Sequence, residues 1–317
     1  MSASAAAKCS ACKRKEPFFH RNYSGEWLCK KCFSESIEGK VRATILKYKM
    51  LSYNDRVAVA VSGGKDSLSL LEVLAKMERK YPRAKLVAVT VDEGIAGYRD
   101  EALEITAKTC KRLRIPHHLV SFKQLYGYTL DEIVQRLRQR GSELTPCAYC
   151  GVLRRKAMNA AALEVKADKI ATGHTLDDEV QTSLMNLFHG DVPKLASEKP
   201  VTERVHPRRV QKIKPFCEVP EKESALYAYV KGIMFQSTPC PYAGEALRND
   251  IRSLLNLMEE RHAGTKFTVF KSIEKIRPAL ASLQEKGEFK ECRQCGDPAA
   301  SELCMACQLL KQIQQIT

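Results

Sequence analysis

Thirteen cysteines dominate the chemistry available to this sequence, and eight of them form two quartets near the two ends of the chain. Each quartet consists of two C-x-x-C pairs, and sulfur ligands paired in this way suit a tetrahedral Zn²⁺ ion. With four cysteine ligands in each, neither quartet leaves an open position, so both are predicted to be structural zinc sites rather than four buried free thiols. The quartets are Cys9, Cys12, Cys29 and Cys32, and Cys292, Cys295, Cys304 and Cys307.

The five remaining cysteines include a further candidate metal site in the middle of the chain. Cys147 and Cys150 form a third C-x-x-C pair, which is predicted to precede a helix, and Cys240 lies between two prolines. Iron–sulfur clusters normally take four thiolates, so three would leave one iron with a vacant position. The alternatives are another kind of open metal site, or ordinary core cysteines. Cys110 falls among apolar residues of a predicted helix and is expected in the core, whereas Cys217 is a candidate for a fourth ligand.

A glycine-rich segment, SGGKDS at residues 62–67, follows an apolar strand and precedes a helix. Two glycines let the backbone turn tightly and approach a ligand. The start of a helix presents unpaired N–H groups and a positive dipole to an anion. Lys65 and the hydroxyls of Ser62 and Ser67 add donors. The spacing matches neither the Walker A nor the dinucleotide motif. The segment therefore predicts a phosphate or pyrophosphate site, against the alternative of an ordinary turn capped by Asp66.

The elements that must position these residues alternate between strands and helices. Alternation with short connections predicts an α/β fold, a parallel sheet with helices on both faces. Residues 191–215 hold several prolines and are expected to form loop or edge structure. Strands are predicted at 56–61, 85–91, 118–122 and 169–172, and helices at 37–51, 66–80, 100–114, 131–140, 153–166, 177–187, 221–231, 244–260 and 269–283. The expected divisions are a zinc module at 1–35, a catalytic domain at 36–285 and a second zinc module at 286–317.

Composition limits the class of protein. The chain has 317 residues, of which 44% are hydrophobic, enough for a core and against wholesale disorder. No apolar run approaches the length of a membrane span, and residues 1–7 lack the apolar stretch of a signal peptide. These features and the odd cysteine count argue against a disulfide framework and favour a cytoplasmic protein without membrane contact. The formal net charge of +15 favours a nucleic-acid partner, and the segment 204–214 is the densest basic cluster.

The chain resembles the tRNA 2-thiouridine synthetases, a family of PP-loop ATP pyrophosphatases with the adenine nucleotide alpha hydrolase-like fold. The resemblance covers nearly the whole sequence, including both terminal quartets. Two of the motifs are more similar to the branch that thiolates the wobble uridine, position 34, than to the T-loop branch acting on position 54. The matching motifs are SGGKDS at 62–67, VDEGIAGYRD at 91–100, PCAYCGVLRR at 146–155, TGHTLDDEVQT at 172–182 and PCPYAGEALR at 239–248.

The resemblance implies an enzyme that adenylates the C2 oxygen of a tRNA uridine with ATP and Mg²⁺ and then replaces that oxygen with sulfur. It implies a [4Fe-4S] cluster on Cys147, Cys150 and Cys240, with Cys147 and Cys240 also catalytic. Asp178 is expected in an acid/base or Mg²⁺-binding role. Arg154 stands where the T-loop branch has a catalytic lysine, and because arginine does not deprotonate it can stabilise charge but not act as a base. The expected nucleotide-binding residues are Ala60, Ser62, Gly63, Gly64, Lys65, Asp66, Ser67, Asp92, Gly173, His174 and Asp178.

Several alternatives stay open at this stage. Asp177 or Asp178 could be a helix cap, and His174 could be a core residue. Sulfur could travel as a persulfide on Cys147 or Cys240 without a cluster. A PP-loop tRNA ligase or amidating enzyme would explain the loop and the charge but not the three central cysteines. A non-enzymatic zinc module that binds RNA would leave SGGKDS without a purpose. The expected partners are tRNA, a sulfur donor that is either a ubiquitin-like thiocarboxylate carrier or sulfide, and a second copy in a homodimer.

Overall fold

A five-stranded parallel sheet forms the centre of the computed structural model, which describes residues 8–79, 83–139, 145–243, 247–282 and 290–315. The spatial order of the strands is β5-β4-β3-β6-β7, with all four pairings parallel. This confirms the predicted α/β class and parallel sheet. The strands are β3 (Arg56–Ala60), β4 (Lys85–Asp92), β5 (His117–Ser121), β6 (Lys169–Ala171) and β7 (Gln211–Ile213).

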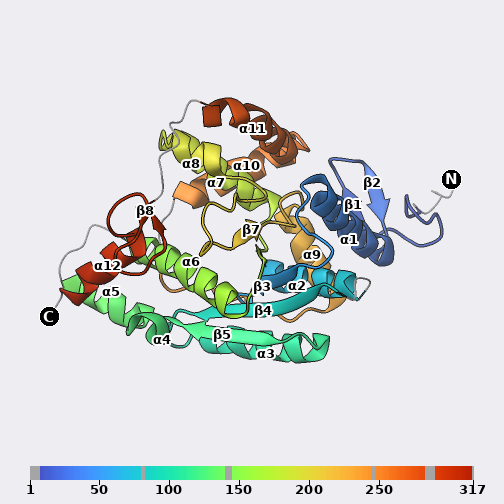
Figure 1. Ribbon diagram of the computed structural model, residues 1–317. Helices are drawn as coiled ribbons and strands as arrows, with labels where there is room; N and C mark the ends of the chain where they lie inside the picture. The colour runs from blue at the N-terminus through green and yellow to red at the C-terminus, as the bar shows by residue number, and fades with distance from the viewer. Residues whose placement is uncertain (1–7, 80–82, 140–144, 244–246, 283–289, 316–317) are drawn as a thin grey trace, which may run out of the picture.

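Helices cover both faces of this sheet (Figure 1). Successive side chains of β3 are buried on opposite faces of the sheet. Val57 and Val59 belong to the hydrophobic cluster on one face, and Ala58 belongs to the cluster on the other. Side chains of successive strand residues point to opposite faces, so a strand buried on both sides reads as a continuous apolar run. The covering helices are α2 (Lys65–Glu78), α3 (Arg99–Leu113), α4 (Phe122–Tyr126), α5 (Leu130–Gln139), α6 (Pro146–Glu164) and α9 (Glu221–Lys231).

Four helices pack together beside the sheet, at the top of Figure 1. The close pairs are α7 with α10, α7 with α11, and α8 with α11. They are α7 (Leu176–Phe188), α8 (Val192–Ser197), α10 (Leu247–Arg261) and α11 (Thr265–Ser282). Within the described residues no helix is both long and apolar enough to cross a membrane.

Each cysteine quartet belongs to a small hairpin followed by a helix, and the two lie on opposite sides of the molecule (Figure 1). The N-terminal hairpin leads into α1, which packs on α9. The C-terminal hairpin leads into α12, which packs on α5 and α6. The elements are β1 (Phe19–Arg21), β2 (Glu26–Leu28) and α1 (Lys30–Lys47), and β8 (Lys290–Glu291), β9 (Pro298–Ala299) and α12 (Met305–Gln314).

The sequence prediction was wrong about the start of α6. The helix begins at Pro146 instead of residue 153, so Cys147 and Cys150 lie in its first turns rather than before it. Pro146 takes the first helical position, where its missing N–H costs no hydrogen bond. The short helices α4 and α8 were not predicted; Ser121 and Asp191 cap them, and Pro193 sits in the first turn of α8.

Other predicted boundaries agree within a few residues, and α9 has the predicted bounds, 221–231. α1 and α11 start earlier than predicted, at Lys30 and Thr265. Residues 1–7, discussed above as lacking a leader, and the predicted helix ends at Lys80, Arg140, Gly244 and Leu283 lie outside the described residues.

A buried ion pair joins the N-terminal module to the core. The Arg21 guanidinium donates to both carboxylate oxygens of Glu223 on α9, at 3.1 and 2.9 Å, and both side chains are at most 5% exposed. Lys40 approaches the same carboxylate at 3.5 Å, and the Tyr23 hydroxyl donates to it. Burying these charges is tolerable only because they pair with one another.

Glu223→Gln removes the charge that compensates buried Arg21 while keeping the shape of the side chain. It should lower the free energy of unfolding by about 3 kcal/mol, the cost of leaving a buried charge unpaired. Chemical denaturation with metal present measures this. Glu26→Gln is the matched control, because Glu26 pairs with the same guanidinium from a half-exposed position and should cost at most about 1 kcal/mol. Equal effects of the two substitutions would contradict the assignment.

Candidate functional site

The SGGKDS segment forms a tight loop between β3 and the first turn of α2. Gly63 has φ of +87°, and a Cβ there would lie 2.6 Å from Cβ of Ala102, so only glycine fits. Gly64 is the N-cap of α2, and a Cβ there would meet only the Ser62 Oγ, at 3.5 Å. Gly64 therefore stays open on its outer side, where an anion can approach the helix N-terminus.

Hydrogen bonds inside the loop fix its shape. The Ser67 hydroxyl donates to the carbonyl of Gly64 at 2.9 Å and accepts from the Ser62 amide at 3.1 Å. Lys65 lies 2.8 Å from a carboxylate oxygen of Asp66 and 2.8 Å from one of Glu221, at the start of α9. Burial raises the pKa of Asp66, although Lys65 opposes the shift. A carboxylate whose pKa is raised by burial beside a charged partner has an environment typical of functional sites.

Arg99 ties this loop to the end of the neighbouring strand, and the sequence analysis missed its role. Its guanidinium donates to the carbonyls of Ser62 at 3.0 Å and Val91 at 2.9 Å, and pairs with Glu93 at 2.9 Å. Glu93 also faces Arg154 of α6 at 3.7 Å. Arg99 and Glu93 belong to the quoted motif VDEGIAGYRD, but a single motif gives no signal of which distant carbonyls a side chain will reach.

The loop after β6 closes the other side of the site. A Cβ on Gly173 would lie 2.9 Å from the backbone carbon of Asp66, so the two loops touch there. Thr175 and Asp178 form a capping box for α7, which makes Asp178, and not Asp177, the carboxylate engaged in capping. The buried Asp177 instead pairs with Lys266 and accepts from the amide of Glu221 at 2.7 Å. Of the two capping alternatives, the one for Asp178 is therefore confirmed and the one for Asp177 is wrong.

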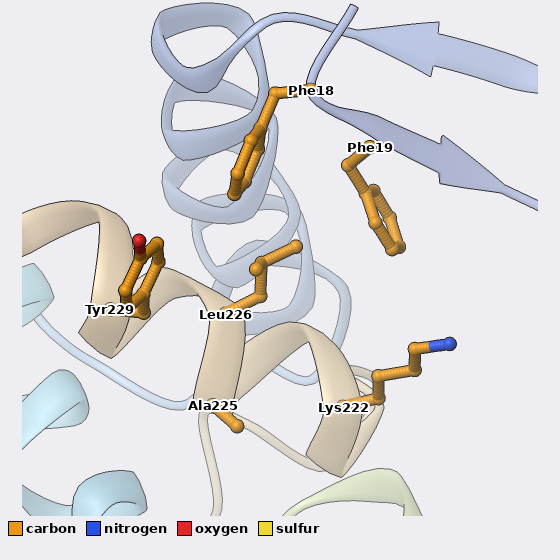
Figure 2. A pocket seen from close by; sticks show the side chains of 6 residues that line it. All are labelled: Phe18, Phe19, Lys222, Ala225, Leu226 and Tyr229. Atoms are coloured by element: carbon orange, nitrogen blue, oxygen red, sulfur yellow. The ribbon is translucent and has the colours of Figure 1, made fainter.

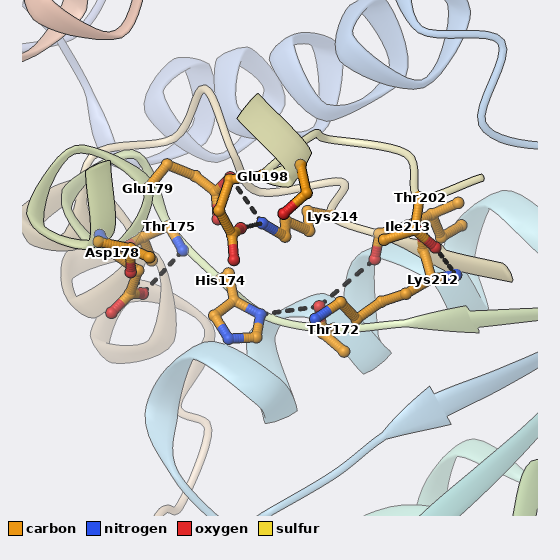
Figure 3. Close-up of polar contacts among 12 residues, drawn as sticks. Thr172, His174, Thr175, Asp178, Glu179, Glu198, Thr202, Lys212, Ile213 and Lys214 are labelled. Carbon is orange, nitrogen blue, oxygen red and sulfur yellow. Dashed lines mark hydrogen bonds and ion pairs between the residues drawn. The ribbon is translucent and has the colours of Figure 1, made fainter. Parts of the chain in front are cut away.

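The basic segment 204–214 was predicted as one surface for RNA, and the structure divides it. Lys214 is buried between the carboxylates of Glu179 and Glu198, 2.8 Å from each, so its charge serves the fold (Figure 3). The side chain of Lys212 extends toward Thr172 and His174 in the same view. Arg204, Arg208 and Arg209 are exposed, as predicted for such a surface.

Lys212 acts electrostatically on His174, and Arg155 in turn acts on Lys212, so these cations lie near one another. Among the described residues, neither the Lys212 ammonium nor the Arg155 guanidinium has an ion pair or a hydrogen bond. The surrounding protein lowers the pKa of Lys212, and Lys214 lowers it further; burial and then Arg154 lower the pKa of Arg155. The surrounding protein and then Lys212 lower the pKa of His174, whose Nδ1 lies 2.8 Å from the Thr172 hydroxyl. A group of uncompensated positive charges of this kind favours an anionic ligand.

The three central cysteines come together at the start of α6. Sγ of exposed Cys147 donates to the carbonyl of Tyr242 at 2.9 Å, which holds the segment carrying Cys240 against the C-x-x-C pair. Burial raises the pKa of Cys150 to about 11, Arg154 opposes the shift, and the charges of Cys240 and Cys147 add to it. The three sulfur atoms are not within 4.8 Å of one another, unlike each terminal quartet.

The other two cysteines lie in the hydrophobic core. Cys110 is buried on α3 as predicted, and burial raises its pKa to about 11. Cys217 is fully buried in the hydrophobic cluster on the opposite side of the sheet from Cys150 and Cys240. The structure gives no support to Cys217 as a fourth ligand.

The two terminal quartets share one local design. All four sulfur atoms of each lie within 4.8 Å of one another. In both, the third cysteine is the N-cap of a helix and its amide donates to Sγ of the first: Cys29 to Cys9 at 3.3 Å and Cys304 to Cys292 at 3.2 Å. Four clustered sulfurs that accept backbone N–H groups fit a tetrahedral thiolate-bound ion.

Comparison with known proteins agrees with this geometry. A family model described as a PP-loop domain matches residues 35–259, which makes the chain a PP-loop protein. It is 35% identical to tRNA 2-thiolation protein NcsA of Haloferax volcanii, over 98% of this chain and 100% of that protein. It is 36% identical to cytoplasmic tRNA 2-thiolation protein 1 of Dictyostelium discoideum, over 96% of this chain and 83% of that protein.

A solved structure is similar over almost its whole length. It is the U34-tRNA thiolase NcsA from Methanococcus maripaludis with its [4Fe-4S] cluster, with a TM-score of 0.83, 35% identity and coverage of 96% of each chain. The chain belongs to the tRNA 2-thiolation family of PP-loop proteins. The resemblance drawn from the motifs and the predicted fold class are both confirmed.

Gly64→Val tests the loop without disturbing it. The branched side chain would fill the side on which a phosphate approaches, while the protein itself leaves room for it. ATP affinity measured by calorimetry should fall at least about tenfold, or roughly 1.4 kcal/mol. Circular dichroism and the melting temperature should stay as in the parent chain. Gly63→Ala is the contrasting variant, because it should destabilise the fold itself. Unchanged ATP affinity in Gly64→Val would refute the phosphate site.

Proposed function

We propose that this protein is an ATP-dependent tRNA-uridine 2-sulfurtransferase, acting on uridine 34. The contact between Cys147 and the segment that carries Cys240 supports this most directly, because it joins three cysteines beside a PP loop. A ligase or amidating enzyme would not explain the three central cysteines, and an RNA-binding zinc module would not explain the loop at residues 62–67. The 35% identity to a U34-tRNA thiolase favours uridine 34 over the alternative, uridine 54.

ATP would bind with its phosphates on the loop at residues 62–67. The open side of Gly64 and the N-terminal turn of α2 supply N–H groups, and Lys65 supplies a charge. Ala60, Asp92, Gly173 and His174 would surround the rest of the nucleotide. Asp66 and Asp178 are suitable Mg²⁺ ligands, because hard cations prefer carboxylate oxygens.

Adenylation makes the C2 oxygen of uridine a good leaving group. That oxygen attacks the α-phosphorus of ATP, the bond to the β-phosphate breaks, and pyrophosphate leaves into the loop. A sulfur nucleophile then forms a bond to C2, and AMP departs with the oxygen. Arg154, Arg155 and Lys212 would stabilise the negative charge of these groups and of the RNA backbone. Neutral His174 can orient a ligand by hydrogen bonding but carries no charge.

The central cysteines would bind the [4Fe-4S] cluster through Cys147, Cys150 and Cys240. Such a cluster would supply an iron with an open position for sulfur. The exposure of Cys147 leaves a path for a donor to that end of the site. Persulfide transfer on Cys147 or Cys240 is the second candidate route, and it needs a lowered thiol pKa. Burial raises that of Cys150, which disfavours it as a persulfide carrier.

The remaining expectations are proposals of the same kind. The terminal quartets would hold two structural Zn²⁺ ions, and residues 1–35, 36–285 and 286–317 would be the structural units. The sulfur donor would be a thiocarboxylate carrier protein or sulfide, and the enzyme would act as a homodimer in the cytoplasm. The name of the Dictyostelium relative supports the last point.

Serine substitution of single cysteines tests the sulfur step. Ser in place of Cys147, Cys150 or Cys240 should abolish iron binding after anaerobic reconstitution and 2-thiouridine formation, with pyrophosphate release retained. The matched controls are Cys110→Ser and Cys217→Ser, which should keep iron because neither thiol is near the trio. A Cys240→Ser variant that keeps both iron and activity would contradict the proposal.

Nucleoside analysis tests which uridine reacts. The purified enzyme, ATP, sulfide and an unmodified tRNA transcript should yield 2-thiouridine at position 34. A transcript with cytidine at position 34 should yield none, and one with cytidine at position 54 should react normally. The reverse pattern would assign the protein to the T-loop activity.

A further inference from the structure

An apolar groove lies between the N-terminal module and α9, away from the loops described above (Figure 2). It is an open hollow of about 420 Å³. We call it the aromatic groove, and its lining residues are Phe18, Phe19, Lys222, Ala225, Leu226 and Tyr229. The lining includes no carboxylate.

Two exposed rings in the aromatic groove have parallel faces. The planes of the Phe18 and Tyr229 rings make an angle of 9°, and the ring centroids are 6.4 Å apart. Tyr229 is 69% exposed and Phe18 36%, so neither ring is part of the core. A flat aromatic ligand can stack on such faces, since parallel π-systems attract at van der Waals distance.

Lysines flank these rings. The Lys30 ammonium is 5.2 Å from the centre of the Phe18 ring, and Lys222 lines the other end of the groove. Within the described residues neither lysine has a carboxylate partner. A second hollow adjoins the first along α1 and α9, and its lining adds Lys31, Lys76 and Lys231. Two carboxylates balance part of this charge: largely buried Glu38 accepts from Lys76 and Lys231, and exposed Glu35 in the same lining pairs with Lys31 at 3.9 Å.

We propose that the aromatic groove binds a single-stranded segment of the RNA substrate. One unpaired base would stack on Tyr229 and Phe18, and Lys30 and Lys222 would contact the flanking phosphates. Stacking platforms inside a basic channel are how proteins hold single strands without reading their sequence. The inference rests on the proposed function for the identity of the RNA. Unpartnered lysines at both ends, no acid in the lining and a net charge of +15 favour a polyanion over a protein partner.

Helix α9 links the groove to the nucleotide site. Glu221, the first residue of α9, pairs with Lys65 of the PP loop, and Lys222 is the next residue. Tyr229 follows Glu221 by eight positions, about 12 Å along a helix. A strand lying on the groove would thus reach the phosphate loop within a few nucleotides. Through α9, the N-terminal module would guide the RNA as well as stabilise the fold.

Tyr229→Ala tests the groove, because this exposed ring makes no hydrogen bond to any described residue and its loss should leave the fold intact. Affinity for a short uridine-rich single strand, measured by fluorescence anisotropy, should fall roughly 5- to 100-fold. Tyr229→Phe keeps the ring and should bind as the parent chain does. Tyr53→Ala removes an exposed ring elsewhere and should have no effect. Binding of a blunt RNA duplex should not change.

Lys30→Gln should lower the slope of log affinity against log salt by about one.

Three results would overturn the inference. The first is a Tyr229→Ala variant that binds the single strand as tightly as the parent chain. The second is an equal loss of single-strand affinity in Tyr229→Ala and Tyr53→Ala. If Tyr229→Ala loses activity only with a protein sulfur donor and keeps its RNA affinity, the groove binds protein instead, and the RNA assignment is wrong.

Failure of the proposed function is separable from failure of this inference. If the parent enzyme forms no 2-thiouridine but Tyr229→Ala still loses single-strand binding, RNA binding by the groove is supported and the sulfurtransferase function is wrong. If the parent enzyme thiolates tRNA and Tyr229→Ala binds and reacts normally, the sulfurtransferase function is supported and RNA binding by the groove is wrong.

Discussion

The buried ion pair between Arg99 and Glu93 is the contact on which the arrangement of the site depends. Arg99 holds the carbonyls of Ser62 and Val91, so it fixes the phosphate loop against the end of β4. Glu93 keeps that guanidinium in place and faces Arg154, one helical turn from Cys150. Both side chains are at most 7% exposed, and a charge left alone at such a depth would be costly. The loop that suits a nucleotide and the helix that carries the cysteines are therefore positioned by one pair of opposite charges.

The lysines and arginines of the chain fall into two groups, those buried in ion pairs and those without an ion pair among the described residues. The net charge alone does not distinguish the two groups. Lys214 and Arg21 are buried with carboxylates and contribute to cohesion, whereas among the described residues Lys212 and Arg155 have no ion pair. Lys212 lies in β7 and Lys214 directly follows that strand, yet only Lys214 pairs with Glu179 and Glu198. An anionic ligand near Lys212 and Arg155 would therefore meet positive charge that no ion pair within the described residues neutralises.

The strands and the phosphate loop could be predicted because their signals are local. A continuous apolar run such as 56–61 indicates a strand buried on both faces, and two glycines before a helix indicate an anion site. The start of α6 could not be predicted from periodicity, because its first turn carries Cys147 and Cys150 rather than an apolar stripe. Arg99, the pairing of Lys214 and the aromatic groove were also missed. Each depends on residues that are distant in the sequence and become neighbours only in the folded sheet.

The proposed metal ligands are completed in a fixed order as the chain is made. The N-terminal quartet is complete once Cys32 has been synthesised, before any strand of the central sheet exists. The proposed cluster ligands Cys147 and Cys150 would have to wait for Cys240, and the last quartet would be complete only with Cys307 in α12. Since domains tend to fold from the N-terminus during synthesis, metal loading would begin at the first module and end at the last.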